Sequence, residues 1–226
     1  MKKLFNDCGI NITEEQLELF EKYYQLLVTY NERFNITAIT ERQEVFVKHF
    51  VDSVIGVDKL KSGQLIDIGS GGGFPAVAIK IMRPDINVTM IEATGKKCTF
   101  LEAVIKELNL KNICVINGRA EELSRQEIYR EKYDICTARA VARLNVLCEY
   151  CMPFVKVGGI FLAYKGNAEE EILEAKNAIE ILGGKLNKVD NYTVVDNSRE
   201  LVYIDKIKPT DKKYPRGRGK ERKSPL

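Results

Sequence analysis

Four of the five residues from 69 to 73 are glycine, and they separate a short apolar run from a second run with helical spacing. Glycine has no Cβ, so such a cluster lets a ligand or another part of the backbone approach the chain closely. A strand, a glycine loop and a helix in this order are typical of open α/β sheets, where ligands bind at the carboxyl ends of strands. The loop is therefore the first candidate for a binding site.

The residues of the loop limit the kind of ligand. A phosphate-binding P-loop requires Gly-Lys-Ser/Thr, which is absent here. Gly69, Gly71 and Gly73 give Gly-x-Gly-x-Gly, and Phe74 stands where the dinucleotide fingerprint has its third glycine. Pro75 has no N–H to offer a diphosphate at the start of the helix. S-adenosylmethionine, which contains no phosphate, fits this loop better. An NAD(P)-dependent oxidoreductase on the same fold is the alternative.

Further polar residues follow the next predicted strands. Glu92 ends the second strand, where an acid commonly binds the ribose diol of a nucleoside. An acid that only stabilises the start of the next helix is the alternative. Arg119, Ala120 and Glu121 follow the third strand, where a loop would pass the adenine. These residues extend the candidate site across neighbouring strands.

Arg139 ends the fourth predicted strand, beside the glycine loop. An arginine pointing into a cleft is costly unless a carboxylate or a ligand pairs with it, which favours a role in the site. A rim arginine paired with a nearby acid is the alternative. The only histidine, His49, lies in a predicted helix and is interpreted as structural.

These residues require an α/β framework. We predict strands at 64–69, 87–93, 112–117, 133–139 and 158–166, alternating with helices at 76–83, 96–109, 142–154 and 168–182. The alternation predicts a mostly parallel, Rossmann-like sheet with helices on both faces, and two extended runs, 187–195 and 199–208, predict an antiparallel edge. A capping box at 13–16 opens an N-terminal helix, and a second helix fits 44–57. We expect an N-terminal helical extension packed on the core (1–60), a Rossmann-like core (61–207) and a basic tail (208–226).

Composition excludes several classes of protein. The chain has 226 residues, 45% of them hydrophobic, which is enough for a sizeable core. No apolar run approaches the ~18 residues of a membrane span, and the first residues lack a signal peptide's apolar core. We therefore expect a cytoplasmic protein without membrane contact, and no protein partner is evident. Cys148 and Cys151 form an isolated CxxC, so reduced thiols are predicted, with a redox role as the alternative and no metal site.

The basic residues are concentrated at the end of the chain. Residues 208–226 carry a net charge of +6, whereas the whole chain carries +3. This asymmetry favours a polyanion such as RNA as the partner, with a solubilising disordered tail as the alternative. The predicted RNA-binding residues are Lys212, Lys213, Tyr214, Arg216, Arg218 and Lys223. Tyr214 suits base stacking and Arg216 suits phosphate contact.

Several motifs together resemble one family. They are "NERFNITAIT", "HFVDS", "DIGSGGGFPAVAIKI", "GRAEEL", "TARAVARL", "YKG" and the tail "KKYPRGRGKERKSPL". The sequence resembles the bacterial 16S ribosomal RNA guanine-N7 methyltransferases, also called glucose-inhibited division protein B, over almost its whole length. The resemblance implies a class I S-adenosylmethionine-dependent methyltransferase that modifies N7 of one guanine in the small-subunit RNA. Gly219-Lys220-Glu221 departs from the Gly-Thr-Pro that is usual at this point of the family tail.

The resemblance also implies roles for particular residues. Gly69 and Phe74 would contact the cofactor, Ala120 and Glu121 would line its adenine, and Arg139 would close the site. The residues that match family positions near the target or cofactor are Asn35, Arg119, Arg139 and Lys165. A residue of the helix C-terminal turn is the alternative interpretation of Asn35.

The chemistry of the expected reaction suits this set of residues. N7 of guanine carries a lone pair and no proton, so it can attack the sulfonium methyl group without a general base. In-line alignment is the main requirement. The cations would hold phosphates, the cofactor carboxylate or the guanine O6 edge instead of acting as acids. A non-catalytic RNA-binding protein that keeps the fold is a further alternative.

Overall fold

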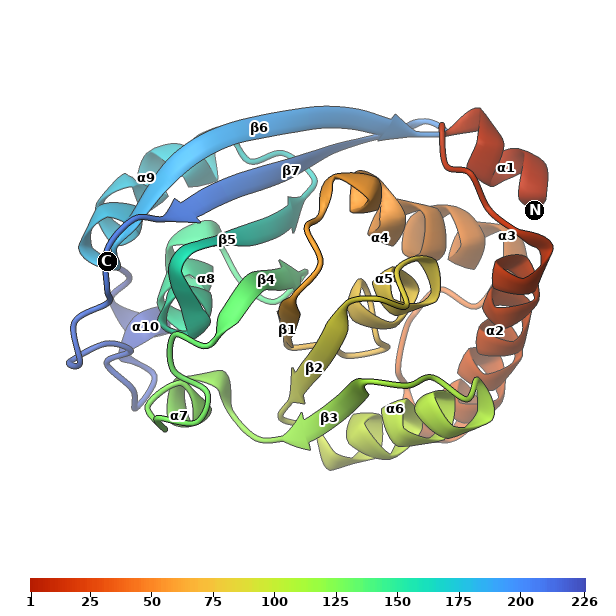
Figure 1. Cartoon of the computed structure of the whole chain (residues 1–226), viewed down its shortest axis with the longest axis horizontal. Helices are drawn as coiled ribbons and strands as arrows, with labels where there is room; N and C mark the ends of the chain where they lie inside the picture. The colour runs from red at the N-terminus through yellow and green to blue at the C-terminus, as the bar shows by residue number, and fades with distance from the viewer.

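One seven-stranded sheet forms the centre of the molecule, with strand order β3-β2-β1-β4-β5-β7-β6. The structure is a computed structural model that describes residues 1–226 (Figure 1). Its strands are β1 (Gln64–Ile68), β2 (Asn87–Glu92), β3 (Ile113–Asn117), β4 (Tyr133–Arg139), β5 (Val155–Lys165), β6 (Gly184–Val194) and β7 (Asn197–Lys206). The first five strands are parallel, and β7 runs antiparallel to both β5 and β6. The predicted mostly parallel sheet with an antiparallel edge is confirmed.

The strand order reverses direction beside β1. The chain places β2 and β3 on one side of β1 and then returns to place β4 on the other side. Such a reversal leaves a crevice at the carboxyl ends of the strands, because the connecting loops diverge there. Gly69 directly follows β1, Glu92 ends β2 and Arg139 ends β4. The topology therefore brings the predicted site residues of the strands to one edge of the sheet.

Helices cover both faces of the sheet (Figure 1). They are α1 (Lys2–Asp7), α2 (Glu14–Phe34), α3 (Arg42–Val45), α4 (Asp52–Val54), α5 (Ala76–Met82), α6 (Gly95–Glu107), α7 (Ala120–Leu123), α8 (Leu144–Cys151), α9 (Glu169–Ile181) and α10 (Lys220–Lys223). One apolar cluster joins α1, α2, α5 and α6 to the sheet, and a second joins α8 and α9 to its other face. The first sixty residues thus share a core with the sheet.

The N-terminal elements match the prediction only in part. Thr13 and Gln16 form the predicted capping box at the start of α2. The predicted helix at 44–57 is confirmed as a helical segment over 42–54, but its middle is a wider π-helical stretch at Phe46–Val51 between α3 and α4. Apolar spacing does not distinguish a π-turn from an α-turn. Such wider turns are frequent at functional sites, and this one contains His49.

The basic tail folds back against the core. Arg130 donates hydrogen bonds to the backbone carbonyls of Thr210, Asp211 and Tyr214 over 2.8–3.1 Å. The short helix α10 then lies beside α8 (Figure 1). The alternative of a disordered tail is wrong for this structure, because Arg130 holds residues 210–214 by hydrogen bonds and Tyr214 packs in the apolar cluster of α8 and α9.

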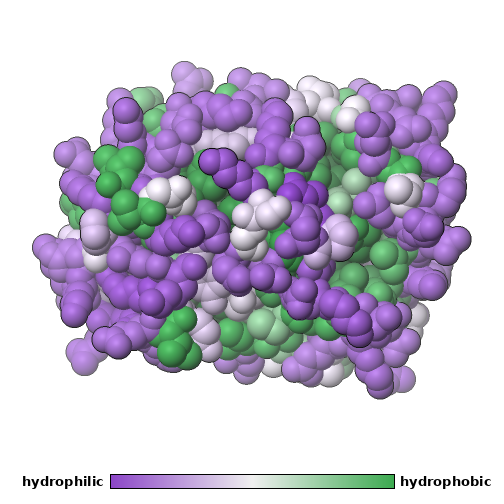
Figure 2. All heavy atoms as spheres, in the orientation of Figure 1, coloured by the Kyte–Doolittle hydropathy of each residue, from purple (hydrophilic) through white to green (hydrophobic).

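The surface is largely hydrophilic. Figure 2 shows charged and polar residues over most of the viewed face, with hydrophobic residues between them. None of the helices combines the length and the apolar character that crossing a membrane requires. All six cysteines are free thiols, and Cys148 and Cys151 are buried.

Candidate active site

The glycines of the loop face two different directions. A Cβ on Gly72 would lie 2.8 Å from the Phe74 ring, and one on Gly73 would lie 2.5 Å from the Tyr23 hydroxyl. Tyr23 of α2 also donates a hydrogen bond to the Gly72 carbonyl. These two glycines therefore allow α2 and its aromatic cluster to approach the loop. Gly69 and Gly71 have left-handed backbones (φ +69° and +56°), and a Cβ on Gly71 would meet nothing closer than 3.8 Å.

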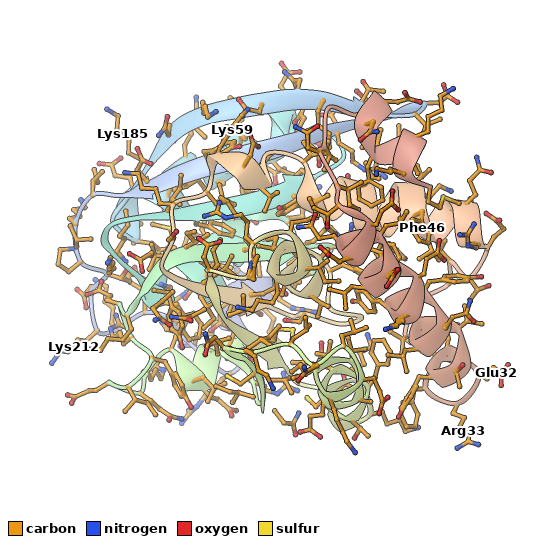
Figure 3. All side chains as sticks on the ribbon, turned by 45° about the vertical axis from the view of Figure 1, so that its right-hand side comes forward. Glu32, Arg33, Phe46, Lys59, Lys185 and Lys212 are labelled. Atoms are coloured by element: carbon orange, nitrogen blue, oxygen red, sulfur yellow. The ribbon has the colours of Figure 1, made fainter.

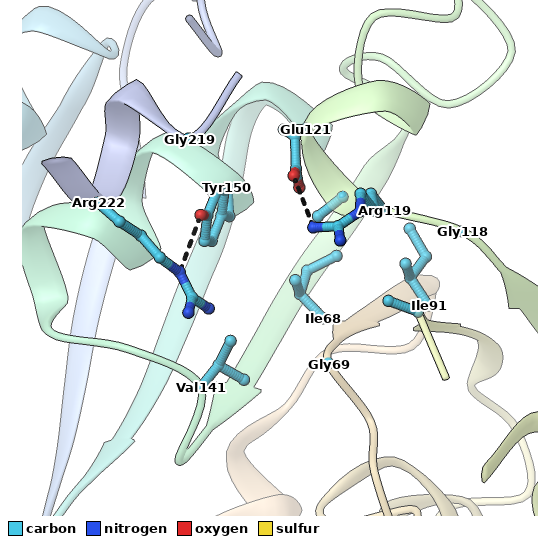
Figure 4. A pocket seen from close by; sticks show the side chains of 12 residues that line it. Ile68, Gly69, Ile91, Gly118, Arg119, Glu121, Val141, Tyr150, Gly219 and Arg222 are labelled. Atoms are coloured by element: carbon cyan, nitrogen blue, oxygen red, sulfur yellow. Dashed lines mark hydrogen bonds and ion pairs between the residues drawn. The ribbon is translucent and has the colours of Figure 1, made fainter. Parts of the chain in front are cut away.

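A pocket of about 270 Å³ opens beside Gly69 (Figure 4). It is lined by Ile68, Gly69, Ile91, Ala93, Gly118, Arg119, Ala120, Glu121, Val141, Tyr150, Gly219 and Arg222. The structure thus brings together four predicted residues: Gly69, Arg119, Ala120 and Glu121. Gly71, Gly73, Phe74 and Glu92 do not line this pocket, and their predicted contacts with a cofactor stay predictions.

The polar groups of this pocket differ in their freedom. The Arg119 side chain is 66% exposed and lies 3.5 Å from the Glu121 carboxylate, whose side chain is 17% exposed. The contact is long and solvated, so it contributes little to stability. Apolar side chains of Ile68, Ile91 and Val141 form the inner walls. A flat apolar slot with a few polar groups at its rim suits a nucleoside.

Glu92 holds the glycine loop against the end of β2. Its Oε2 accepts a hydrogen bond from the Gly71 N–H, and its Oε1 accepts one from the Thr94 N–H, each over 2.8 Å. The residue is 6% exposed, between the pocket residues Ile91 and Ala93. Each carboxylate oxygen retains a lone pair for another donor, such as a ribose hydroxyl. Thr94 is the N-cap residue of α6, so the Glu92 carboxylate also binds a backbone N–H at the start of this helix.

Arg139 is held by three hydrogen bonds inside the protein. Its Nη1 donates to Asp52 Oδ2 (2.8 Å) and to the Lys48 carbonyl (3.1 Å), and its Nη2 donates to His49 Nδ1 (3.0 Å). The guanidinium also lies 5.3 Å from the centroid of the Phe74 ring. With 13% of its side chain exposed, Arg139 organises the N-terminal helices around the end of β4.

His49 is the centre of this cluster. Because Arg139 can only donate, His49 Nδ1 accepts, and the proton of the neutral ring lies on Nε2, which donates to Thr37 Oγ1 over 2.9 Å. The ring stacks on Phe74 with centroids 4.5 Å apart. Burial and the Arg139 charge lower the pKa of His49 to about 4. The ring is neutral at pH 7, in agreement with a structural role.

A second pocket, of about 320 Å³, adjoins the Arg139 cluster. It is lined by Ile39, Lys48, His49, Asp52, Arg139, Ala140, Tyr164, Lys165, Gly166 and Arg199. Asp52 also accepts a hydrogen bond from the Tyr192 hydroxyl (3.1 Å) and lies 3.5 Å from Arg199 Nε. Arg199 was not found from the sequence, where it was only one polar residue in a predicted edge strand.

Two further predicted residues have structural contacts of their own. Lys165 donates to Glu171 Oε2 (2.6 Å) and to the Ala142 carbonyl (2.8 Å), so it ties the loop after β4 to the start of α9. Asn35 is the C-cap of α2 with a left-handed backbone (φ 49°) and an exposed side chain, as in its alternative interpretation. It lies outside the lining of both pockets.

Asp67 is a buried acid of β1, outside the lining of both pockets, that sequence reasoning did not single out. It is 1% exposed, and its Oδ1 accepts a hydrogen bond from Thr137 Oγ1 over 2.6 Å, whereas its Oδ2 has no partner. Burial raises the pKa of Asp67 to about 6. Perturbed buried acids are frequent at functional sites. An acid inside an apolar strand, two residues before the first glycine, was the available signal.

The predicted RNA-binding residues of the tail divide into two groups. Tyr214 is 8% exposed, and Arg216 forms an ion pair with the buried Glu149 carboxylate over 2.8 Å. The other four, Lys212, Lys213, Arg218 and Lys223, are exposed. Figure 3 shows Lys212 pointing outward at the end of the molecule opposite Glu32 and Arg33. No group of His, Cys, Asp or Glu side chains is arranged to hold a metal ion.

Solved structures define the class of fold. TYW2 of M. jannaschii, in complex with AdoMet, matches 69% of this chain and 77% of its own, with a TM-score of 0.54 and 15% identity. The precorrin-6y C5,15-methyltransferase of Geobacter metallireducens matches 69% of this chain and 87% of its own, with a TM-score of 0.52 and 14% identity. The protein has the class I methyltransferase fold.

Sequence comparison then gives the family. The family model described as rRNA small subunit methyltransferase G (GidB) matches residues 16–202. The relative from Leuconostoc citreum is 44% identical, over 98% of this chain and 95% of its own. The relative from Lachnoclostridium phytofermentans is 47% identical, over 96% of this chain and 93% of its own. The chain belongs to the rRNA small subunit methyltransferase G family, as its motifs indicated, and is an rRNA methyltransferase of the small subunit.

Proposed function

We propose that the protein transfers a methyl group from S-adenosylmethionine to N7 of one guanine in 16S ribosomal RNA, in the cytoplasm. The observation that carries this proposal is the nucleoside-sized pocket beside Gly69 in a chain that matches the family over nearly its whole length. The family name specifies small-subunit ribosomal RNA. The pocket supports the choice of cofactor, whereas 16S RNA, the guanine and its N7 atom are what the resemblance to the family implies.

The loop geometry supports a cofactor without phosphate. The N–H groups of Gly69 and Ser70 bind the Ile91 carbonyl, that of Gly71 binds Glu92, and that of Gly73 binds the Ser70 carbonyl. A diphosphate would need such N–H groups as free donors. The NAD(P) alternative therefore has little support. The apolar walls fit an adenine, and Glu92 has lone pairs left for a ribose diol.

The reaction needs alignment more than acid–base chemistry. When bound, S-adenosylmethionine supplies an electrophilic methyl group on a sulfonium centre. Guanine N7 carries a lone pair and no proton, so it would accept this methyl group without a general base. The residues of the two pockets would have to hold the base and the methyl donor in line. The neutral His49 fits this chemistry, because burial and the Arg139 charge keep its pKa well below 7 and the reaction needs no acid.

The second pocket is the proposed site of the target nucleotide. It adjoins the Arg139 cluster and is lined by Lys48, which pairs with Glu44, and by Arg199, which lies 3.5 Å from Asp52. Both are partly exposed cations that we propose to exchange these contacts for phosphate when RNA binds. Lys165 and Arg139 hold its floor by their contacts with α9 and with Asp52. The exposed basic residues of the tail are proposed to contact neighbouring RNA, with an affinity that falls with salt.

The test is transfer of labelled methyl from S-adenosylmethionine to 16S RNA and to small-subunit particles, followed by mapping of the modified base. Label on one guanine N7 supports the proposal in full. RNA binding without label would favour the non-catalytic alternative. Reduction of NAD(P) with no methyl transfer would favour the oxidoreductase.

A further inference from the structure

The C-terminal segment 216–223, called the strap below, forms part of the cofactor pocket. Gly219 and Arg222 line this pocket, although Gly219 lies 69 residues beyond Tyr150, the last of the other lining positions (Figure 4). The remaining lining residues come from the ends of β1 and β2 and the loops that follow β1 to β4, from α7 and from α8. The strap therefore covers a side of the pocket that the parallel sheet leaves open.

Buried charges hold the strap in place. The Arg216 backbone N–H and guanidinium both donate to Glu149, whose side chain is 1% exposed, over 2.7–3.1 Å. Glu221 is fully buried and accepts a hydrogen bond from the Gly217 N–H. This contact closes the turn at residues 217–221, and so Glu221 has a defined role where the family usually has another residue. The strap is a fixed element, since breaking a buried ion pair is costly.

Arg222 is the strap residue with unused donors. Its Nε donates to the Tyr150 hydroxyl over 3.3 Å, and no carboxylate lies within ion-pair distance of its guanidinium. Its Nη1 and Nη2 have no partner in the protein, and Figure 4 shows them between Tyr150 and Val141, on the pocket side. Arginine offers five donors in a planar fork, and the four on the two terminal nitrogens of Arg222 are unpaired in a side chain that is exposed and lines the pocket.

We propose that Arg222, positioned by Tyr150, binds the adenosyl group of the cofactor through the acceptor atoms of its base or ribose. This inference rests on the proposed function, because it requires S-adenosylmethionine in this pocket. The strap thereby becomes a component of cofactor binding, and its basic residues have a second role besides RNA contact. Tyr150 acts through Arg222 and is a positioning residue.

The experiment is titration calorimetry of the full-length chain with S-adenosylmethionine. The wild type is compared with Arg222→Met, Arg222→Lys, Tyr150→Phe and Lys220→Met. Lys220 is an exposed cation of the same short helix that does not line the pocket, so Lys220→Met is a control of equal charge change. We expect Arg222→Met to raise the cofactor Kd about tenfold, and Tyr150→Phe about threefold, as for loss of one charge-assisted hydrogen bond. Arg222→Lys should restore part of the affinity, and Lys220→Met should match the wild type.

Each result decides a different point. A wild-type Kd in Arg222→Met would overturn the role of Arg222 and leave the proposed function intact. Equal losses in Arg222→Met and Lys220→Met would also overturn it, because the effect would then be one of net charge. Absence of binding by the wild type would overturn the proposed function and this inference together. Thermal unfolding of the ligand-free variants checks that the strap remains folded.

Discussion

Two arginines on the same edge of the sheet differ in almost every contact. Arg139 donates three hydrogen bonds, to Asp52, His49 and the Lys48 carbonyl, and it is largely buried. Arg222 has one hydrogen bond, to Tyr150, and leaves its terminal nitrogens free beside the pocket. A cation held by an ion pair and further hydrogen bonds fixes the elements around it, whereas a cation whose terminal N–H groups are unpaired can donate them to a ligand. Position at the end of a strand therefore does not by itself define a ligand-binding residue.

The same difference holds for the two pockets. The pocket near Arg139 has walls from the N-terminal helices, from β5 and from β7, joined by a network around Asp52. The pocket near Arg222 has walls from the strand ends and from the strap. The first resembles a preorganised surface for a large substrate, and the second a slot for a small molecule. The N-terminal helices thus supply a wall of one pocket and the strap a wall of the other, and the ends of the strands supply the rest.

Removal of Arg139 is expected to have the largest effect. Arg139→Ala leaves the Asp52 carboxylate, 6% exposed, without its main cation, and should lower the free energy of unfolding by about 3–5 kcal/mol. Methyl transfer should fall with it. Denaturant titration and the transfer assay measure the two effects. A variant as stable as the wild type would show that Arg139 is not the scaffold described here.

The double variant Arg139→Met/Asp52→Asn sharpens this test. It removes both charges, so it should be more stable than Arg139→Ala, because no unpaired buried charge remains. If it still transfers no methyl group although it is folded, the arginine has a role in the reaction besides its structural one. Additive losses in the single and double variants would contradict the proposed pairing.

Glu92 joins the two regions, since it holds the loop between them. Glu92→Gln places an amide donor against the N–H of Gly71 or Thr94, so we expect the cofactor Kd to rise about 10–100-fold and stability to fall by about 1–2 kcal/mol. Calorimetry and thermal unfolding measure these changes. Glu102→Gln, on the exposed side of α6, is the matched control. A normal Kd for Glu92→Gln would remove the ribose role.

Two buried groups, His49 and Asp67, predict opposite responses of the free energy of unfolding to pH. The pKa of His49 is lowered to about 4 from 6.5, so between these values the unfolded chain binds more protons and stability falls as pH falls. The pKa of Asp67 is raised to about 6 from 3.8, so its contribution to stability falls as pH rises through the same range. The two effects partly cancel in the wild type.

Single variants separate these effects. His49→Gln should remove the part of the stability loss that His49 causes as the pH falls. Between pH 7 and pH 5 the variant should therefore lose about 1–3 kcal/mol less free energy of unfolding than the wild type. Asp67→Asn should leave the His49 effect unopposed, so the free energy of unfolding should fall more steeply with falling pH in this variant than in the wild type. Urea denaturation between pH 4.5 and 7.5 gives both slopes. Parallel slopes in all three proteins would show that neither group is perturbed as described.

The sequence predicted the central region better than its two ends. All five parallel strands and the residues at their carboxyl ends follow from local apolar runs, which the sheet buries directly. The pairing of Arg139 with Asp52 was not predictable, because the partner lies 87 residues away, at the start of α4 directly after the π-helical stretch. The strap was missed for a related reason. Its charges suggested a solvated tail. In the structure it is held by Glu149 and Tyr150, which the sequence showed only as two residues of the predicted helix at 142–154.

The smallest expected effect concerns the exposed part of the tail. Lys212→Met/Lys213→Met should weaken RNA binding modestly and reduce the slope of log K against log salt by about 1.4–1.8, since about 0.7–0.9 of slope is lost per phosphate contact. Lys106→Met, at the end of α6, is the control for a lost surface charge. The cofactor Kd should stay unchanged in all these variants, in contrast to Arg222→Met. Because the lysines and Arg222 lie on one folded segment, a loss of cofactor affinity in the lysine variant would mean that the strap is anchored by more than Glu149 and Tyr150. An unchanged salt slope would show that the RNA meets another face of the molecule.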